Sequence, residues 1–408
     1  MHGSSLLLQR NNASRCSSIC LIFSTTSEVP VISATGIRGA MPSIMSSSSP
    51  LLRIRQDVQS MHAYAIQEAT GLIKLDAMEN PYTLPEVLQA ELGQRLGQVA
   101  VNRYPGQRVA DLQAALARYI QLPDGCALML GNGSDELISL LALACDRPTV
   151  DGQPATILAP LPGFVMYAMS AQLQGLRFVG VDLTADFELD VPAMLAAMNQ
   201  HRPAIVYLAY PNNPTANLWD DEAIEQIVVR QAELGGLVVM DEAYQPFAAR
   251  SYLQRMVGHK HVLLMRTLSK FGLAGVRLGY MVGPSELVAE VDKVRPPYNV
   301  SVLNAECALF ALEHADVFAQ QAEAIRTSRA ALLADLAGLP GVKVFPSEAN
   351  MVLVRVPDAA KCFEGMKRAG VLVKNVSKMH PLLSQCLRLT VGTPEENRLM
   401  LAALQNNL

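Results

Sequence analysis

Short apolar runs alternate with helix-like stretches from about Leu51 to the end of the chain, and this alternation confines the fold to the α/β class. The runs are rich in β-branched residues, which is typical of strands buried in a parallel sheet. The predicted parallel strands are Ala155–Ala159, Ile205–Ala209, Leu237–Met240, His261–Met265 and Leu278–Val282. The stretches between them repeat apolar residues every three or four positions, as helices that cover a sheet do. The predicted helices are Ala110–Tyr119, Glu136–Cys145, Pro192–Gln200 and Glu222–Leu234.

The pattern changes after Lys293 and predicts a second, smaller α+β domain. It begins with one long helical stretch, from about Ala305 to Leu336. Three short strands follow around another helix, at Val342–Phe345, Met351–Arg355 and Leu387–Val391. The segment Gly71–Pro85 has no place in the first domain, and we expect it to pack near the C-terminal one.

Length and composition exclude several classes of protein. At 408 residues, with 50% hydrophobic and 17% charged residues, the chain exceeds one small module and is not disordered over most of its length. The net charge of −4 comes from 33 basic and 37 acidic residues, so no global field attracts nucleic acid or an anionic membrane. The longest apolar runs fall far short of the roughly 20 residues of a spanning helix.

The seven cysteines are scattered, with no CxxC motif and no Cys/His pair at metal-ligand spacing. We therefore predict reduced thiols, no bound metal and a cytosolic protein.

Residues 1–50 differ from the rest of the chain. They are rich in serine and contain Arg10, Arg15 and Arg38 but no lysine, no aspartate and one acidic residue, Glu28. We expect this leader to lie outside the fold. A transit peptide, a disordered leader and a wrongly assigned start codon all remain open.

The strongest local signal for chemistry is the loop that follows the strand His261–Met265. It contains Thr267, Ser269 and Lys270, then a glycine-rich stretch that ends at Arg277. A lysine in this apolar setting is of the desolvated kind that forms Schiff bases, while the hydroxyls and the guanidinium suit an anion. A phosphate loop or a structural turn is the alternative interpretation.

A second signal is Asp241, which ends the apolar strand Leu237–Met240. Ligands of open α/β sheets bind at the carboxyl ends of strands. An aspartate there can keep a pyridine nitrogen protonated, which pyridoxal phosphate requires to accept electrons. Tyr244 could donate to the phenolate of the same ring. A capping carboxylate or a Mg²⁺ ligand is the alternative, although no Gly-x-x-x-x-Gly-Lys loop accompanies it.

Two turns add weaker signals. Tyr210–Thr215 follows the strand Ile205–Ala209 and places two asparagines between prolines, which makes a rigid turn that can fix an amide. Gly131–Glu136 is a glycine-rich turn that opens an apolar helix, where backbone N–H groups favour a phosphate. Alone, the first suits an ordinary turn and the second a plain helix cap.

These four motifs, in this order and each at a strand-to-helix junction, resemble the fold-type I pyridoxal-phosphate aminotransferases. Within that group, the chain is most similar to the histidinol-phosphate aminotransferases from about Leu51 onward. The similar segments are Asp76–Tyr82, Arg103–Gly106, Arg266–Lys270 and Cys386–Thr393. The resemblance implies a large domain with a mostly parallel sheet covered by helices, and a smaller α+β domain. It divides the chain into a leader (1–50), an N-terminal arm with part of the small domain (51–99), a large cofactor-binding domain (100–295) and a C-terminal small domain (296–408).

The resemblance also implies roles for the residues around the cofactor ring. Lys270 would bind pyridoxal 5′-phosphate covalently and, once displaced by substrate, move the proton between substrate and cofactor. Asp241 would pair with the ring nitrogen, and Tyr244 and Asn213 would bond the 3′ oxygen. Phe164 would stack on the ring; the family commonly has tyrosine here, but stacking needs only the aromatic face.

The cofactor phosphate would be held by backbone groups and side chains from three segments: Ser134, Asp135, Thr267, Ser269 and Arg277. Tyr104 would reach the same phosphate from the other subunit, which implies a homodimer.

Substrate binding is implied for three residues. Arg388 matches the arginine that grips a carboxylate in one half-reaction and a phosphate in the other. Lys374 lies where the family often has a second arginine, and lacks its forked geometry. Asn80 is a further candidate contact.

The expected activity is transfer of an amino group between glutamate and imidazole-acetol phosphate, which gives histidinol phosphate and 2-oxoglutarate. An aromatic-amino-acid aminotransferase or a threonine-phosphate decarboxylase on the same fold is the nearest alternative. A transcription regulator that keeps such a domain is disfavoured, because the leader lacks the helical periodicity of a helix-turn-helix. No nucleic-acid or membrane partner is expected.

Overall fold

The computed structural model describes residues 49–61, 67–148 and 152–408. The chain divides into two compact units, 1–62 and 63–408. In the first, Ser49 caps the short 3₁₀ helix η1 (Pro50–Arg53), which precedes α1 (Gln56–Gln59). Apart from its last two residues, the leader predicted at 1–50 lies outside the described ranges.

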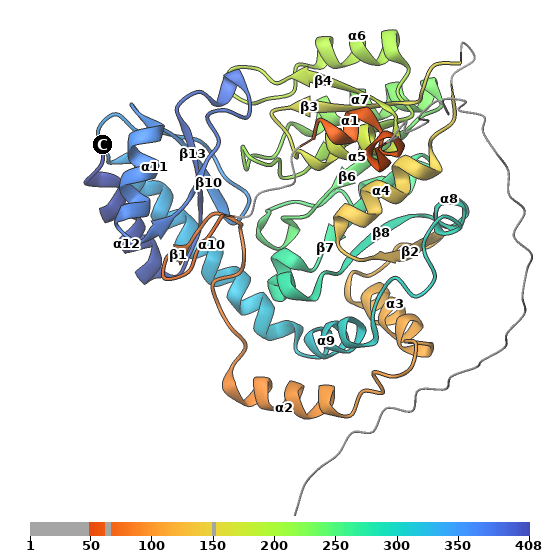
Figure 1. The fold of residues 1–408 in the computed structure, drawn as a ribbon, viewed down its shortest axis with the longest axis horizontal. Helices are drawn as coiled ribbons and strands as arrows, with labels where there is room; N and C mark the ends of the chain where they lie inside the picture. Colours follow the sequence, from red (N-terminus) through yellow and green to blue (C-terminus); the bar gives the residue numbers. More distant parts are fainter. Residues whose placement is uncertain (1–48, 62–66, 149–151) are drawn as a thin grey trace, which may run out of the picture. The chain divides into compact units, whose positions relative to one another are not determined.

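The second unit is built around a seven-stranded sheet with the order β2-β8-β7-β6-β5-β3-β4 (Figure 1). The strands are β2 (Cys126–Gly131), β3 (Thr156–Leu161), β4 (Arg177–Asp182), β5 (Ile205–Ala209), β6 (Leu237–Asp241), β7 (Val262–Thr267) and β8 (Gly279–Pro284). All five predicted strands are confirmed as strands, while β2 and β4 were not predicted.

The prediction that every one of these strands is parallel is wrong for β8. It pairs antiparallel with both β7 and β2, whereas β3 to β7 pair parallel. A strand buried on both faces is an apolar run whichever way it points, so the sequence does not encode its direction. The segment 268–278 instead returns the chain beside β7 without a crossover helix.

Helices cover the sheet, and the four predicted ones are confirmed (Figure 1). They are α3 (Gln107–Tyr119), α4 (Ser134–Ala144), α6 (Val191–His201) and α7 (Asp221–Leu234). Local capping sets the ends of α7: Asp220 accepts hydrogen bonds from the N–H groups of Glu222 and Ala223, and Gly235 ends the helix in the left-handed conformation. Helices α2 (Glu86–Gly97), α5 (Met166–Gln174) and α8 (Ser285–Asp292) were not predicted.

A smaller sheet forms the C-terminal α+β part, with the order β12-β13-β10-β9. Its strands are β9 (Lys343–Val344), β10 (Met351–Arg355), β12 (Lys374–Asn375) and β13 (Cys386–Thr390). Helices α10 (Ala315–Ala337), α11 (Ala359–Arg368) and α12 (Pro394–Gln405) lie beside it (Figure 1). The long helical stretch predicted from about Ala305 to Leu336 is helical but is divided into two helices, because α9 (Val302–Glu313) ends before His314 and α10 begins after it.

The segment Gly71–Pro85 packs against the C-terminal part, as predicted. Its strand β1 (Ile73–Lys74) pairs in parallel with β11 (Val371–Leu372). The buried Asn350 side chain donates a hydrogen bond to the Met78 carbonyl at 2.9 Å, and the Met78 N–H donates to Thr390 Oγ1 at 3.1 Å. These contacts fix the residues that follow β1 beside the carboxyl ends of the large sheet.

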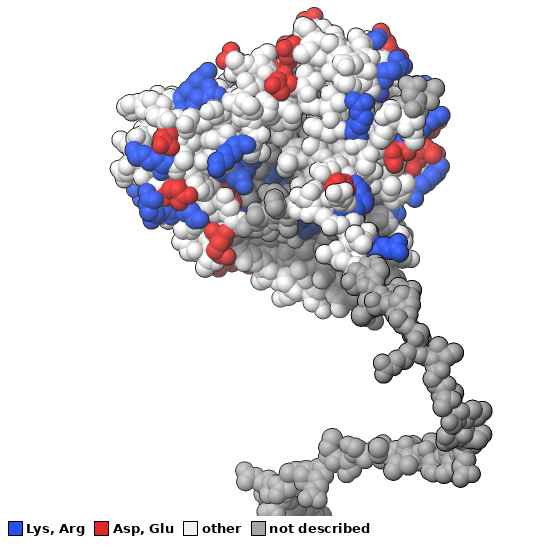
Figure 2. Space-filling model, turned by 45° about the horizontal axis from the view of Figure 1, so that its top comes forward, with Lys and Arg blue, Asp and Glu red and all other residues white. Residues whose placement is uncertain are grey.

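Strands β5, β6 and β7 are parallel and in register, so their carboxyl ends meet at one edge. Ala209 pairs with Asp241, and Asp241 pairs with Met265. Among the described residues, no helix combines the length and the apolar character that crossing a membrane requires. Acidic and basic side chains are interspersed over the face drawn in Figure 2, which gives that face no field of a single sign.

Candidate active site

A cavity of about 350 Å³ lies at the carboxyl edge of β5, β6 and β7. Side chains from all four sequence motifs line it, together with the segment that follows β1. The predicted site residues at its wall are Ser134, Asp135, Phe164, Asn213, Asp241, Tyr244, Thr267, Ser269, Lys270 and Arg277. The lining also includes Ala77, Met78 and Glu79 from the segment after β1.

Lys270 lies in the turn η4 (Ser269–Leu273), directly after β7, in which Gly272 departs from helical backbone angles. Gly272 permits this turn: its φ is 137°, and a Cβ there would lie 2.8 Å from the Phe318 ring. The Lys270 ammonium donates a hydrogen bond to the Ala77 carbonyl at 2.9 Å.

Burial lowers the pKa of Lys270 to about 7, and the positive charge of Arg388 adds to this effect. A substantial share of the amine is therefore neutral near neutral pH. A neutral amine is the nucleophilic form, so the site makes Lys270 available for attack on a carbonyl.

Asp241 ends β6, and its carboxylate is almost completely buried at the cavity wall. Burial raises the pKa of this carboxyl to about 6, and hydrogen bonds from Tyr167 and from the Ala243 N–H oppose that rise. The neighbouring carboxylates of Asp135 and Glu242 raise it further. A cation placed against Asp241 would therefore be bound strongly.

The other end of the cavity is suited to an anion. Helix α4 begins after Gly133, which has no side chain to cap the first N–H groups, and Ser134 and Asp135 face the cavity. The Thr267 hydroxyl lies 2.9 Å from Ser269 Oγ. Arg277 is within 3.5 Å of Ser269 Oγ and of the Asp135 carboxylate.

Asn213 and Tyr244 line the cavity, and the buried Arg388 lies behind Asn213. Arg388, on β13, is 8% exposed and donates to Asn213 Oδ1 at 2.8 Å and to the Asp76 carbonyl at 2.7 Å. The Tyr244 ring is buried, and its centroid lies 5.8 Å from Lys270 Nζ. Arg388 is not among the residues that line the cavity, and it reaches the wall through Asn213.

Besides Arg388, three of the predicted residues are not among those that line this cavity. Tyr104 is 75% exposed and stacks on Tyr298 with ring centroids 4.3 Å apart. The Asn80 amide donates to the Gln321 side chain at 2.8 Å. Lys374 is half-buried on β12, where it pairs with Arg388 across the strands.

Sequence reasoning missed Tyr167, which lies on α5 and donates a hydrogen bond to Asp241 Oδ2 at 2.7 Å. No motif marks this tyrosine. Its one signal is its place three residues after Phe164. The Phe164 side chain lines the cavity, and its ring meets the Tyr167 ring edge-on with the ring centroids 5.6 Å apart.

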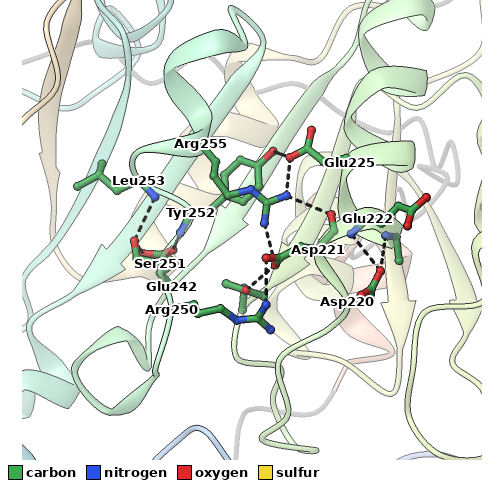
Figure 3. A network of polar contacts seen from close by, with 12 residues as sticks. Asp220, Asp221, Glu222, Glu225, Glu242, Arg250, Ser251, Tyr252, Leu253 and Arg255 are labelled. Carbon is green, nitrogen blue, oxygen red and sulfur yellow. Dashed lines mark hydrogen bonds and ion pairs between the residues drawn. The ribbon is translucent and has the colours of Figure 1, made fainter.

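It also missed the polar network that follows Asp241 in the sequence (Figure 3). Glu242 is fully buried and forms an ion pair with Arg266 at 2.8 Å. The same carboxylate accepts hydrogen bonds from the Tyr252 N–H and, at 3.0 Å, from the Ser251 hydroxyl.

The same polar network continues to α7, where the Arg255 guanidinium forms ion pairs with Asp221 and with Glu225, each at 2.7 Å. It thereby ties Glu242, the residue after Asp241, to β7 and to the loop between β6 and β7.

A family model described as "Aminotransferase class I and II" matches residues 70–404. A histidinol-phosphate aminotransferase of Methylibium petroleiphilum is 71% identical over 355 residues, which are 87% of this chain and 94% of that protein. A second, from Polaromonas naphthalenivorans, is 68% identical over 365 residues, 89% of this chain and 99% of that one.

A crystal structure of a histidinol-phosphate aminotransferase from Sinorhizobium meliloti in complex with pyridoxal 5′-phosphate has the same fold, with a TM-score of 0.76. It is 24% identical, and the match covers 88% of this chain and 98% of that one.

Proposed function

The chain belongs to the class I and II aminotransferases, and we propose that it moves an amino group between glutamate and imidazole-acetol phosphate. The products are histidinol phosphate and 2-oxoglutarate. One observation carries this proposal: Lys270, Asp241 and an anion-binding helix start line one cavity in a chain 71% identical to a histidinol-phosphate aminotransferase.

The residues at the cavity wall fit pyridoxal 5′-phosphate. The buried Asp241 carboxylate suits a protonated ring nitrogen, and the start of α4 suits a phosphate. A Cβ on Gly279 would come within 2.8 Å of the Ser134 nitrogen, so the glycine there lets β8 lie directly against this anion site. When bound, this cofactor accepts the electron pair left on the substrate Cα after its proton is removed.

Lys270 is the proposed covalent attachment point and proton carrier. Its amine is deprotonated at little cost near neutral pH, because burial lowers its pKa to about 7. It can therefore accept the proton from the substrate Cα and deliver it to the cofactor. Asp241 holds the proton on the ring nitrogen through its charge.

The remaining wall residues hold and orient the cofactor. Ser134, Asp135, Thr267, Ser269 and Arg277 are proposed to bind its phosphate. Tyr244 and Asn213 are proposed to bond the 3′ oxygen, and Phe164 to cover one ring face.

Arg388 is the proposed anion receptor for substrate. Its guanidinium is rigid because it is buried and donates to Asn213 and to the Asp76 carbonyl. A planar fork of donors serves a carboxylate in the glutamate half-reaction and a phosphate in the other. Asn80 and Lys374 are secondary candidates, because neither residue lines the cavity.

We also propose a cytosolic homodimer in which Tyr104 binds the phosphate of the partner's cofactor. The exposure of Tyr104 and its absence from the residues that line the cavity support this assignment. The five cysteines in the described ranges are free thiols, which suits a reducing compartment.

Substrate competition tests the proposed reaction. The purified enzyme is given glutamate with either imidazole-acetol phosphate or phenylpyruvate, and kcat/KM is measured for each acceptor. We expect the phosphorylated acceptor to be preferred by at least about thirtyfold, because its doubly charged phosphate makes stronger charged hydrogen bonds with Arg388 than the singly charged carboxylate of phenylpyruvate. A preference for phenylpyruvate would favour an aromatic-amino-acid aminotransferase, and release of CO₂ from threonine phosphate would favour a decarboxylase.

The Lys270→Ala variant tests the proposed chemistry at its centre. We expect transamination to be lost while the fold and some cofactor binding persist, because Asp241 and the phosphate site remain. Turnover near the wild-type rate would contradict the assignment of Lys270.

A further inference from the structure

The carboxylate of Asp241 depends on one side chain for its hydrogen bonding. Its Oδ2 accepts from the Tyr167 hydroxyl at 2.7 Å, and its Oδ1 accepts from the Ala243 N–H at 3.1 Å. No other side chain in the described part of the chain donates to it. The acidic neighbours Asp135 and Glu242 disfavour its charged form. Tyr167 is therefore the side chain that stabilises the carboxylate through a hydrogen bond.

Tyr167 is itself held rigidly. The residue is 2% exposed, and its ring stacks on Tyr207 with centroids 4.3 Å apart and planes 9° from parallel. Phe164 meets the same ring edge-on, with centroids 5.6 Å apart. Burial, together with Asp241, raises the pKa of the Tyr167 phenol far above its usual value, so the hydroxyl keeps its proton. Since an ionised carboxylate only accepts hydrogen bonds, the hydroxyl must donate to it.

We propose that Tyr167 is a positioning residue, whose hydroxyl keeps the Asp241 carboxylate ionised and oriented, and thereby sets the affinity of the site for a protonated ring nitrogen. This inference rests on the proposed function, in which Asp241 receives that nitrogen. Tyr167 touches the wall residue Phe164 as well as Asp241, so one side chain links the proposed ring-covering residue to the proposed nitrogen-binding one.

Two ligands separate this role from a general structural one. Pyridoxamine 5′-phosphate binds without a covalent bond to lysine, and its analogue with carbon in place of the ring nitrogen keeps the same shape and phosphate. An effect that acts through Asp241 must change the affinity for the first ligand only. An effect on packing must change both.

The Tyr167→Phe variant removes the hydroxyl and keeps both ring contacts. We expect the Kd of cofactor-free protein for pyridoxamine 5′-phosphate to rise about ten- to a hundredfold, the loss typical of one hydrogen bond to a buried charge. The Kd for the analogue should stay within about twofold. Equal weakening of both ligands, or no weakening of either, would overturn the inference.

Tyr207→Phe is the matched control. It removes the hydroxyl of the other ring in the same stack, which makes no hydrogen bond to Asp241. We expect the ratio of the two Kd values to match that of the wild type. A change in this ratio as large as that in Tyr167→Phe would show that the stack, rather than the hydroxyl, is responsible.

A double-variant cycle completes the test. In an Asp241→Ala background, Tyr167→Phe should have no further effect on either Kd, because the group through which it acts is gone. If wild-type protein binds the two ligands equally, the proposed role of Asp241 fails as well. If the wild type prefers the ring nitrogen and Tyr167→Phe keeps that preference, only the inference about Tyr167 fails.

Discussion

Lys270 and Asp241 are a basic and an acidic group buried in one cavity, and burial moves their pKa values toward each other. The pKa of Lys270 falls to about 7 and that of Asp241 rises to about 6. Both pKa values therefore lie near neutral pH, which suits Lys270 to proton transfer. The same burial makes both charges unfavourable for the folded protein until a ligand compensates them.

The buried lysine gives a testable dependence of stability on pH. An unfolded lysine has a pKa near 10.4, so between about pH 7 and 10.4 the unfolded chain binds more protons than the folded one. The penalty of burying the charge is full below pH 7 and disappears as the pH rises through this window. We expect cofactor-free Lys270→Met to unfold with a free energy up to about 5 kcal/mol higher than wild type below pH 7, and with no such advantage near pH 10.5.

Chemical denaturation at a series of pH values measures this difference. The control is Lys293→Met, which removes an exposed lysine paired with Glu290. A difference between Lys270→Met and wild type that stayed constant from pH 7 to 10 would show that the amine is not desolvated.

Arg388 is expected to affect both half-reactions. Arg388→Ala removes a buried guanidinium that also holds Asn213, and such a loss costs about 2–5 kcal/mol, or roughly thirty- to several-thousand-fold in kcat/KM. Separate single-turnover measurements with glutamate and with the phosphorylated acceptor would test this. Arg398→Ala, which removes an exposed arginine paired with Glu395, is the control. A defect confined to one half-reaction would show that the two substrates do not share this cation.

At the scale of elements, the site depends on where β8 passes the start of α4. A Cβ on Gly279 would lie 2.8 Å from both the Gly133 carbonyl carbon and the Ser134 nitrogen, which are backbone atoms that cannot rotate away. Gly279→Ala must therefore displace the first turn of α4. We expect a loss of about 1–3 kcal/mol in stability and a weaker affinity for pyridoxal phosphate.

Thermal denaturation and cofactor titration check this prediction. Gly93→Ala is the control, because a Cβ at this position in α2 has no atom within 4 Å and alanine favours a helix. Unchanged cofactor affinity in Gly279→Ala would show that the anion site tolerates a shift of α4.

At the scale of the whole molecule, the proposed sharing of Tyr104 between subunits can be tested by mixing inactive variants. Hybrid dimers of Lys270→Ala and Tyr104→Ala subunits contain one site with both defects and one with neither. If Tyr104 acts in the partner's site, random reassociation should restore about a quarter of the wild-type activity. A mixture of Lys270→Ala and Asp241→Ala should restore none, because those residues line the same subunit's cavity. Absence of recovery in the first mixture would place Tyr104 outside the partner's site.

Local sequence was sufficient for most of the elements in the large sheet. Strands β5 to β7 are continuous apolar runs buried along nearly their whole length, and α7 carries its own cap residues. Strand β4 was missed because it lies at the sheet edge, is mostly exposed or half-buried, and has only the short apolar run Phe178–Val181, which Gly180 interrupts. The break between α9 and α10 was missed because neither glycine nor proline marks His314.

The sequence by itself determined which residues could do chemistry, because lysine, aspartate and glycine-rich turns stand at strand ends and parallel strands share one carboxyl edge. Tertiary structure alone decided the direction of β8, the position of Arg388 behind Asn213 and the contact of Tyr167 with Asp241. These depend on pairing between segments far apart in the chain, and no local periodicity encodes such a pairing. The pKa values of Lys270 and Asp241 were decided in the same way, because burial sets them and burial exists only in the folded chain.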